Sequence, residues 1–133
     1  FTDFAHSPSK LKATVKAVRN QYPDKKIIAC MELHTYSSLS ENFLSQYAGT
    51  MDLADEAYVF FNPHAIELKR LAAITTQQVE AAFAKKGLQA FDDIESLKAK
   101  LTATPQSNCV VLFLSSGNFA GTDLKALAEK MLS

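Results

Sequence analysis

The stretch NCVVLFL at residues 108–114 is the strongest strand signal in the chain. A second run, KKIIACME at residues 25–32, is nearly unbroken in its apolar centre. Runs this short and this apolar are typical of parallel strands whose two faces are both covered by helices. The two runs therefore predict an α/β fold built on a buried parallel sheet.

Strand-like and helical segments alternate along the 133 residues. A first strand ends at Asp3, and further strands are predicted at 25–32, 55–61, 88–91 and 108–114. Helices are predicted at 7–22, 75–85 and 92–101, from near residue 38 and from residue 122 or 123, while 65–73 stays open. Because helices that join parallel strands make right-handed crossovers, we expect a three-layer Rossmann-like sandwich with a mostly parallel sheet of about five or six strands.

The composition is that of a folded domain with no dominant charge. Apolar residues make up 47% and charged residues 21%, and 14 basic side chains balance 14 acidic ones. This balance supplies no basic stripe for a phosphate backbone, so we expect no nucleic-acid partner. No apolar run approaches the roughly 20 residues of a membrane helix, and no signal peptide is visible, so we expect no membrane contact.

Two cysteines, Cys30 and Cys109, each lie inside an apolar run. We interpret both as buried thiols, with a structural disulfide as the less favoured alternative, and a reducing compartment, the cytoplasm, as their setting. Phe1 opens in what resembles the end of a strand, so we expect the chain to begin inside a longer polypeptide.

Three loops follow the predicted strands at their carboxyl ends, where parallel sheets bind ligands. They span residues 3–7, 33–38 and 115–121. In the first loop, Asp3 and His6 stand beside a helix start, an arrangement that suits a nucleotide, although Asp3 as a simple strand end and His6 as an exposed turn residue remain an alternative. For the second loop, the alternative to a ligand site is a solvated turn. For the third loop, it is a plain strand-to-helix turn. The three histidines and scattered acids show no metal-ligand spacing, so no metal ligand is assigned.

The first loop, DFAHSP at residues 3–8, resembles the Asp-Tyr-Ala-His-x-Pro signature that opens the third domain of Mur ligases. Phe4 replaces the usual tyrosine, and Ser7 stands where muramate–alanine ligases commonly have a second histidine. The resemblance implies that Asp3 binds the ribose of ATP. It also implies that His6 lies near the phosphates or the acyl-phosphate intermediate, as a cofactor-binding and catalytic residue.

The second and third loops carry further parts of this resemblance. The second is similar to the family's Pro-His-x-Tyr-(Ser/Thr)-Arg segment, which helps to place the incoming amino acid or peptide. Leu33 and Ser38 depart from its proline and arginine. The third resembles the family's Gly-Ala-Gly-Asn segment. The substrate-binding residues that the resemblance implies are His34, Thr35, Tyr36, Ser37, Gly117 and Asn118.

The implied function is that of a cytoplasmic carboxylate–amine ligase in peptidoglycan synthesis or recycling. Residues 1–133 would form the carboxy-terminal domain, inactive alone, behind an N-terminal UDP-sugar-binding domain and a central ATPase domain that binds most of the Mg²⁺. The missing arginine favours the murein peptide ligase branch, which adds L-alanyl-γ-D-glutamyl-meso-diaminopimelate to UDP-N-acetylmuramate, over addition of L-alanine. A non-catalytic Rossmann-like nucleotide- or anion-binding module and a flavodoxin-like protein remain as alternatives.

Overall fold

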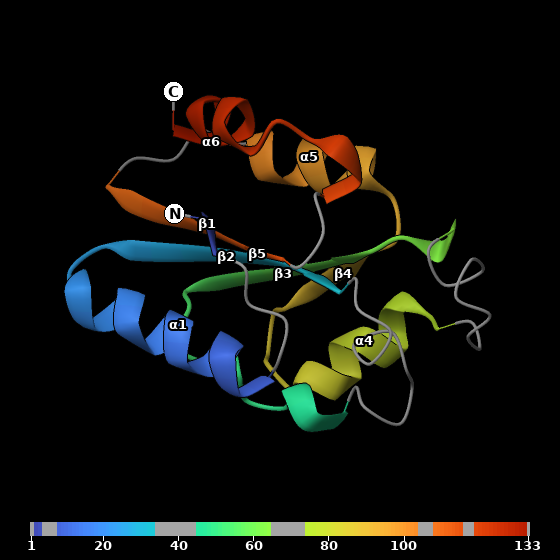
Figure 1. Cartoon of the computed structure of the whole chain (residues 1–133), viewed down its shortest axis with the longest axis horizontal. Coiled ribbons are helices and arrows are strands. Elements are labelled where there is room, and N and C mark those ends of the chain that lie inside the picture. Colours follow the sequence, from blue (N-terminus) through green and yellow to red (C-terminus); the bar gives the residue numbers. More distant parts are fainter. Residues whose placement is uncertain are drawn as a thin grey trace.

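The chain folds as three layers, with a parallel sheet between two layers of helices (Figure 1). The computed structural model describes residues 2–3, 8–33, 45–64, 74–103, 108–115 and 119–132. Its strands are β1 (Thr2–Asp3), β2 (Lys26–Leu33), β3 (Glu56–Phe61), β4 (Gln89–Phe91) and β5 (Cys109–Ser115). Its helices are α1 (Pro8–Gln21), α4 (Thr76–Phe83), α5 (Ile94–Thr102) and α6 (Leu124–Leu132), with short 3-10 helices η1 (Ser45–Tyr47) and η2 (Phe119–Gly121).

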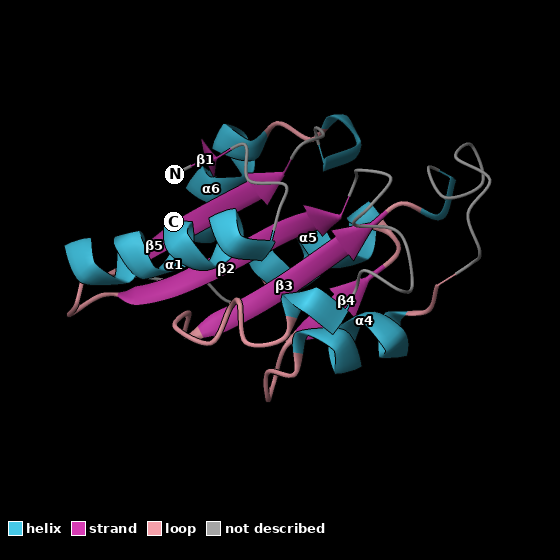
Figure 2. Ribbon diagram, turned by 60° about the horizontal axis from the view of Figure 1, so that its bottom comes forward, coloured by secondary structure: helices cyan, strands magenta, loops and turns pink. Residues whose placement is uncertain are grey.

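The strands lie in the order β1-β5-β2-β3-β4, and each described pair is parallel. The arrowheads of β5, β2 and β3 point the same way in Figure 2. The predicted three-layer Rossmann-like sandwich is therefore confirmed, with five strands in the described residues. Of the helices in these ranges, none has the length and apolar character needed to cross a bilayer.

Alternate residues of the strands face opposite helix layers. On β2, Ile27 and Met31 pack in the cluster that includes side chains of α1 and α4, whereas Ile28 and Cys30 pack in the cluster that includes side chains of α5 and α6. Figure 1 shows α1 and α4 below the sheet and α5 and α6 above it. Because both faces of β2 are covered, almost all of its positions must be apolar, which explains the unbroken run in the sequence.

The predicted helix starts near residues 75, 92 and 123 are found, and capping side chains fix them. Thr75 and Gln78 form a capping box at the start of α4. Asp93 accepts a hydrogen bond from the Ser96 N–H, and Asp123 accepts one from the Ala126 N–H. The α4 helix ends at Phe83, two residues before the predicted end, because the next residue adopts a left-handed conformation. The helix predicted from near residue 38 and the open segment 65–73 fall in ranges outside the described residues.

The two cysteines are free, and only one is buried. Cys30 is fully buried, and burial, followed by the nearby Glu56 carboxylate, raises the pKa of its thiol. Cys109 is only partly buried, so the prediction of two buried thiols is wrong for this residue. Cys109 is the first residue of β5 and pairs with Lys26 at the edge where β2 begins, so the helix layers cover it incompletely.

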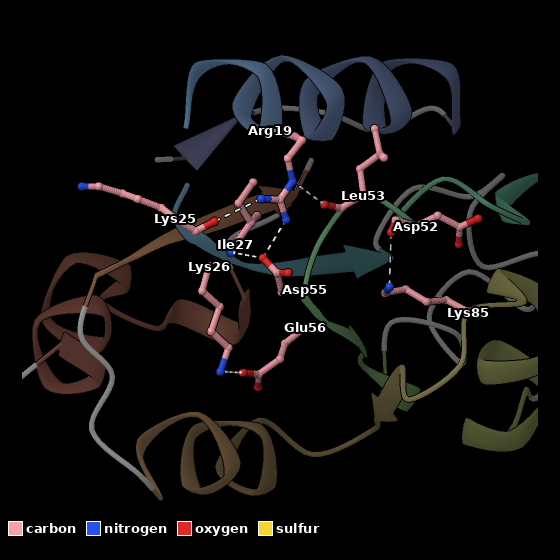
Figure 3. A network of polar contacts seen from close by, with 9 residues as sticks. All are labelled: Arg19, Lys25, Lys26, Ile27, Asp52, Leu53, Asp55, Glu56 and Lys85. Atoms are coloured by element: carbon pink, nitrogen blue, oxygen red, sulfur yellow. Dashed lines mark hydrogen bonds and ion pairs between the residues drawn. The ribbon is translucent and has the colours of Figure 1, made fainter. Parts of the chain in front are cut away.

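A polar network closes the amino edge of the sheet (Figure 3). The Arg19 guanidinium on α1 donates hydrogen bonds to the Leu53 carbonyl at 3.0 Å and to the Lys25 carbonyl at 3.1 Å. It also donates to Asp55 Oδ2 at 2.6 Å, and the same oxygen accepts the Ile27 N–H at 2.7 Å. One arginine thus joins the end of α1 to the chain entering β2 and β3.

We expect Asp55→Asn to lower the free energy of unfolding by about 1 kcal/mol at pH 7. Burial raises the pKa of the Asp55 carboxyl, but the Ile27 N–H and the Arg19 guanidinium outweigh burial and hold this pKa below its ordinary value. The carboxylate therefore stabilises the fold fully above the unfolded-state pKa of about 3.9, and this contribution is lost as the pH falls through the lower folded-state pKa.

Urea unfolding followed by circular dichroism at pH 7, 5 and 3.5 measures this effect. The difference between wild type and Asp55→Asn should shrink at the lowest pH. The matched control is Asp92→Asn, which changes an exposed carboxyl and is expected to alter stability by less than about 0.5 kcal/mol. An equal loss for Asp55→Asn at every pH would show that the Asp55 charge contributes nothing to the network.

Candidate functional site

The carboxyl ends of β1, β5 and β2 lie side by side at one edge of the sheet. Asp3 pairs with Leu114, and Ser115 pairs with Glu32. The three strands end at Asp3, Ser115 and Leu33, and by this register their ends lie within two residues of one another. We call this edge, defined by the ends of β1, β5 and β2, the carboxyl rim. It is the edge from which the three predicted loops depart.

The structure describes the strand ends of this rim and few of the predicted site residues. The backbone of Asp3 is described as the end of β1. The other predicted site residues lie outside the described ranges: His6, His34, Thr35, Tyr36, Ser37, Gly117 and Asn118. Their individual roles therefore stay predictions, whereas the common edge from which their loops start is observed.

Glu32 is a buried acidic residue at the carboxyl rim, and sequence reasoning assigned it no role. Its side chain belongs to a residue that is 2% exposed, one position before the end of β2. Its Oε1 accepts a hydrogen bond from the Phe119 backbone N–H at 2.9 Å. An acid at the end of an otherwise apolar strand is a visible sequence feature, but its partner 87 residues away is not.

Phe119 is fixed on several sides. Its ring, 1% exposed, lies 6.3 Å from the ring of Phe60 in a stacked arrangement and 5.7 Å from that of Phe113 edge to face. Its carbonyl accepts hydrogen bonds from the Thr122 hydroxyl at 2.6 Å and the Thr122 N–H at 3.1 Å. Its φ of 51° is strained for an aromatic residue, so these contacts hold a conformation that the residue does not favour by itself.

Two clefts are lined by described residues outside the carboxyl rim. One of about 460 Å³ is formed mainly by α5 and α6, and one of about 280 Å³ lies near the beginning of β3, beside Lys85 and Gln89. The described residues that line them do not include Leu33, Ser115 or any residue of 119–121. Within the described ranges, no three His, Cys, Asp or Glu side chains gather as a metal-binding group. The candidate site is therefore defined by the neighbouring strand ends and not by a cavity.

Residues 1–117 match the protein family described as "Mur ligase, glutamate ligase domain". The chain belongs to this Mur ligase family. The matched range includes the motif at 3–8 and the whole of the second loop. The family that the sequence resembled is thereby confirmed.

Mur ligases also appear among the individual proteins to which the chain is similar. It is 31% identical over 116 residues to the UDP-N-acetylmuramate–L-alanine ligase of Leuconostoc citreum (strain KM20), covering 87% of this chain and 24% of that protein. The murein peptide ligase structure from Psychrobacter arcticus 273-4 matches with a TM-score of 0.69 and 16% identity, covering 96% of this chain and 26% of that one.

A third similar protein is a crystallised domain from Haemophilus ducreyi 35000HP, described as part of a UDP-N-acetylmuramate:L-alanyl-γ-D-glutamyl-meso-diaminopimelate ligase. It matches with a TM-score of 0.63 and 22% identity, covering 97% of this chain and 88% of that one. At these identities the likeness to solved structures shows the fold alone. The chain spans about a quarter of the length of the curated Mur ligase that it matches at 31% identity.

Proposed function

We propose that residues 1–133 are the carboxy-terminal domain of a three-domain Mur ligase that joins an amino acid or a peptide to UDP-N-acetylmuramate. The observation that carries the proposal is the carboxyl rim, because all three loops with Mur ligase motifs start from this edge. The preceding UDP-sugar-binding and central ATPase domains would supply the sugar nucleotide and the phosphate-binding loop. The chain alone would be inactive.

The chemistry needs an activated carboxyl group, because a carboxylate is too poor an electrophile to react with an amine. ATP phosphorylates the muramyl carboxylate, and the incoming amine then displaces phosphate from the acyl phosphate. In this scheme Asp3 accepts hydrogen bonds from the ribose hydroxyls, and His6 lies near the phosphates or the acyl phosphate. His34, Tyr36 and Asn118, with their neighbours in the second and third loops, position the amine.

The described part of the first loop is compatible with a nucleotide. β1 ends at Asp3 and α1 begins at Pro8, so a short connection leads from a strand end to a helix start. The first turn of α1 contains no acidic residue, and its N–H groups give that end a positive partial charge that favours phosphate. Mg²⁺ would be bound mainly by the central domain. The two free cysteines support placing the reaction in the cytoplasm.

The favoured acceptor is L-alanyl-γ-D-glutamyl-meso-diaminopimelate, with L-alanine as the alternative. A small amino acid presents little besides its charged ends, so a site for it needs a cation for the carboxylate. Ser38 stands where the family's arginine is found in alanine-adding enzymes. The Leuconostoc citreum relative is named an L-alanine ligase and the Psychrobacter arcticus structure a murein peptide ligase, so both acceptors belong in the test.

A phosphate-release assay on the full-length protein tests the proposal. The assay contains ATP, Mg²⁺ and UDP-N-acetylmuramate, with either L-alanine or the tripeptide as acceptor. We expect rapid release with the tripeptide and release slower by about tenfold or more with L-alanine. Faster release with L-alanine would overturn the acceptor assignment. No release with either acceptor, together with retained nucleotide binding, would favour the non-catalytic binding module.

A further inference from the structure

We propose that Glu32 is a positioning residue for the acceptor, acting through its hydrogen bond to the Phe119 backbone. This inference rests on the proposed function, because it assigns Glu32 to the same carboxyl rim. It adds a residue that touches neither nucleotide nor acceptor but fixes the two loops predicted to hold the acceptor.

The position of this hydrogen bond is what gives it a role. Glu32 lies two residues before His34, and Phe119 directly follows Asn118. The 2.9 Å contact between Glu32 Oε1 and the Phe119 N–H therefore joins the residue before the second loop to a residue of the third loop. One buried side chain thus holds two described backbone positions, 32 and 119, that flank the predicted acceptor residues in the sequence.

The surroundings of Glu32 are those of a core position. Alternation along β2 places it on the same face as Ile28 and Cys30, toward the layer in which Phe113 and Phe119 pack. A polar group buried in such a place is unfavourable unless it is hydrogen-bonded, and an apolar side chain would serve packing equally well. The carboxyl group is therefore better explained by the backbone that it holds than by the stability of the core.

Phe119 is the point at which this restraint acts. The residue has a positive φ and is held at its N–H by Glu32 and at its carbonyl by Thr122. Strained backbone of this kind persists only where the surroundings determine it, and it is concentrated at functional sites. Removal of the accepting oxygen would let the backbone at residue 119 leave its positive φ. We expect the acceptor to bind less tightly as a result.

Steady-state kinetics on the full-length protein test this role, with ATP and tripeptide varied in turn. Glu32→Ala removes the accepting oxygen, and Glu32→Met removes it while keeping most of the side-chain volume. Both should raise the KM for the tripeptide by about tenfold and leave the KM for ATP within about twofold of wild type. Glu32→Gln keeps an oxygen that accepts the Phe119 N–H and should restore the acceptor KM to within about threefold.

Glu80→Ala is the matched control. Glu80 Oε2 also accepts a hydrogen bond from a backbone N–H, that of Ala90, at 3.0 Å. Ala90 lies on β4, the edge strand farthest from β1 in the sheet order. We expect this variant to leave both KM values unchanged. A tripeptide KM that stays at the wild-type value in Glu32→Ala and Glu32→Met, or that rises equally in Glu80→Ala, would overturn the role of Glu32.

The failure of this inference is separable from the failure of the proposed function. A wild-type protein that releases no phosphate with either acceptor refutes the ligase proposal and, with it, an acceptor role for Glu32. An active wild type whose Glu32 variants keep a normal acceptor KM refutes the role of Glu32 alone. A rise in acceptor KM that Glu32→Gln reverses supports both.

Discussion

Phe83→Ala is expected to lower the free energy of unfolding by about 3–5 kcal/mol, the range for removing a fully buried aromatic ring. Phe83 is 0% exposed, and its ring stacks on that of Tyr47 with centroids 5.0 Å apart. Its backbone carbonyl also accepts the Gly49 N–H at 3.0 Å. Removing the ring therefore leaves a cavity where α4 packs against the segment around η1, and urea unfolding of wild type and variant measures the loss.

Phe91→Ala provides the matched control for this prediction. Phe91 is only partly buried at the end of the edge strand β4, with its ring centroid 6.4 Å from that of Tyr58. We expect a loss of roughly half that of Phe83→Ala, because less apolar surface is removed from contact. Equal and small losses in the two variants would contradict the packing of Phe83 between α4 and the segment around η1.

If the full-length protein is the proposed ligase, Asp3→Ala is expected to raise its KM for ATP by about 10- to 100-fold. A hydrogen bond to a charged group contributes roughly 1.5–3 kcal/mol, and 1.4 kcal/mol corresponds to a factor of ten in affinity. Asp3 ends β1 at the carboxyl rim, where a carboxylate would meet the ribose hydroxyls. Initial rates with ATP varied at saturating UDP-N-acetylmuramate and acceptor measure this change.

His34→Ala is the comparison variant for Asp3→Ala. His34 belongs to the loop that follows β2, so we expect a higher KM for the acceptor and an unchanged KM for ATP. An Asp3 variant with wild-type ATP dependence would remove Asp3 from the nucleotide site. Identical effects of the two substitutions on both KM values would contradict the assignment of Asp3 to the nucleotide and of His34 to the acceptor.

The fold was predictable because its main signals are local. The runs at 25–32 and 108–114 are apolar since helices cover both faces of β2 and β5, and this pattern is visible without any tertiary knowledge. Helix starts were equally predictable, because the Thr75 and Asp93 side chains accept hydrogen bonds from N–H groups only three residues further along the chain. Chain order and crossover handedness then predicted which strand ends share an edge.

The features that escaped prediction depend on contacts between distant segments. The partial exposure of Cys109 follows from its place at the amino edge of the sheet, and the Arg19–Asp55 contact joins residues 36 positions apart. The Glu32–Phe119 hydrogen bond spans 87 positions. The positive φ of Phe119 is not indicated by its residue type. Such features require the register of the sheet, which the apolar pattern alone does not give.

For the candidate site, the sheet shows the predicted common edge of the strand ends, and no ligand contact is tested. The rule that ligands gather at the carboxyl ends of parallel strands selected loops that start from one edge, and the sheet order places β1, β5 and β2 next to one another. The roles of His6, His34 and Asn118 come from family motifs and remain predictions. The role of Glu32 could not be predicted, because its partner Phe119 lies 87 positions further along the chain.

Hydrogen–deuterium exchange on the full-length protein tests the carboxyl rim most directly. The protein is compared alone and with ATP, Mg²⁺, UDP-N-acetylmuramate and tripeptide. We predict slower exchange in peptides that cover residues 3–7, 33–38 and 115–121 together, and unchanged exchange at the amino edge around residues 22–26 and 52–55. Protection at the amino edge, or protection that leaves all three loops unchanged, would contradict a ligand site at the carboxyl rim.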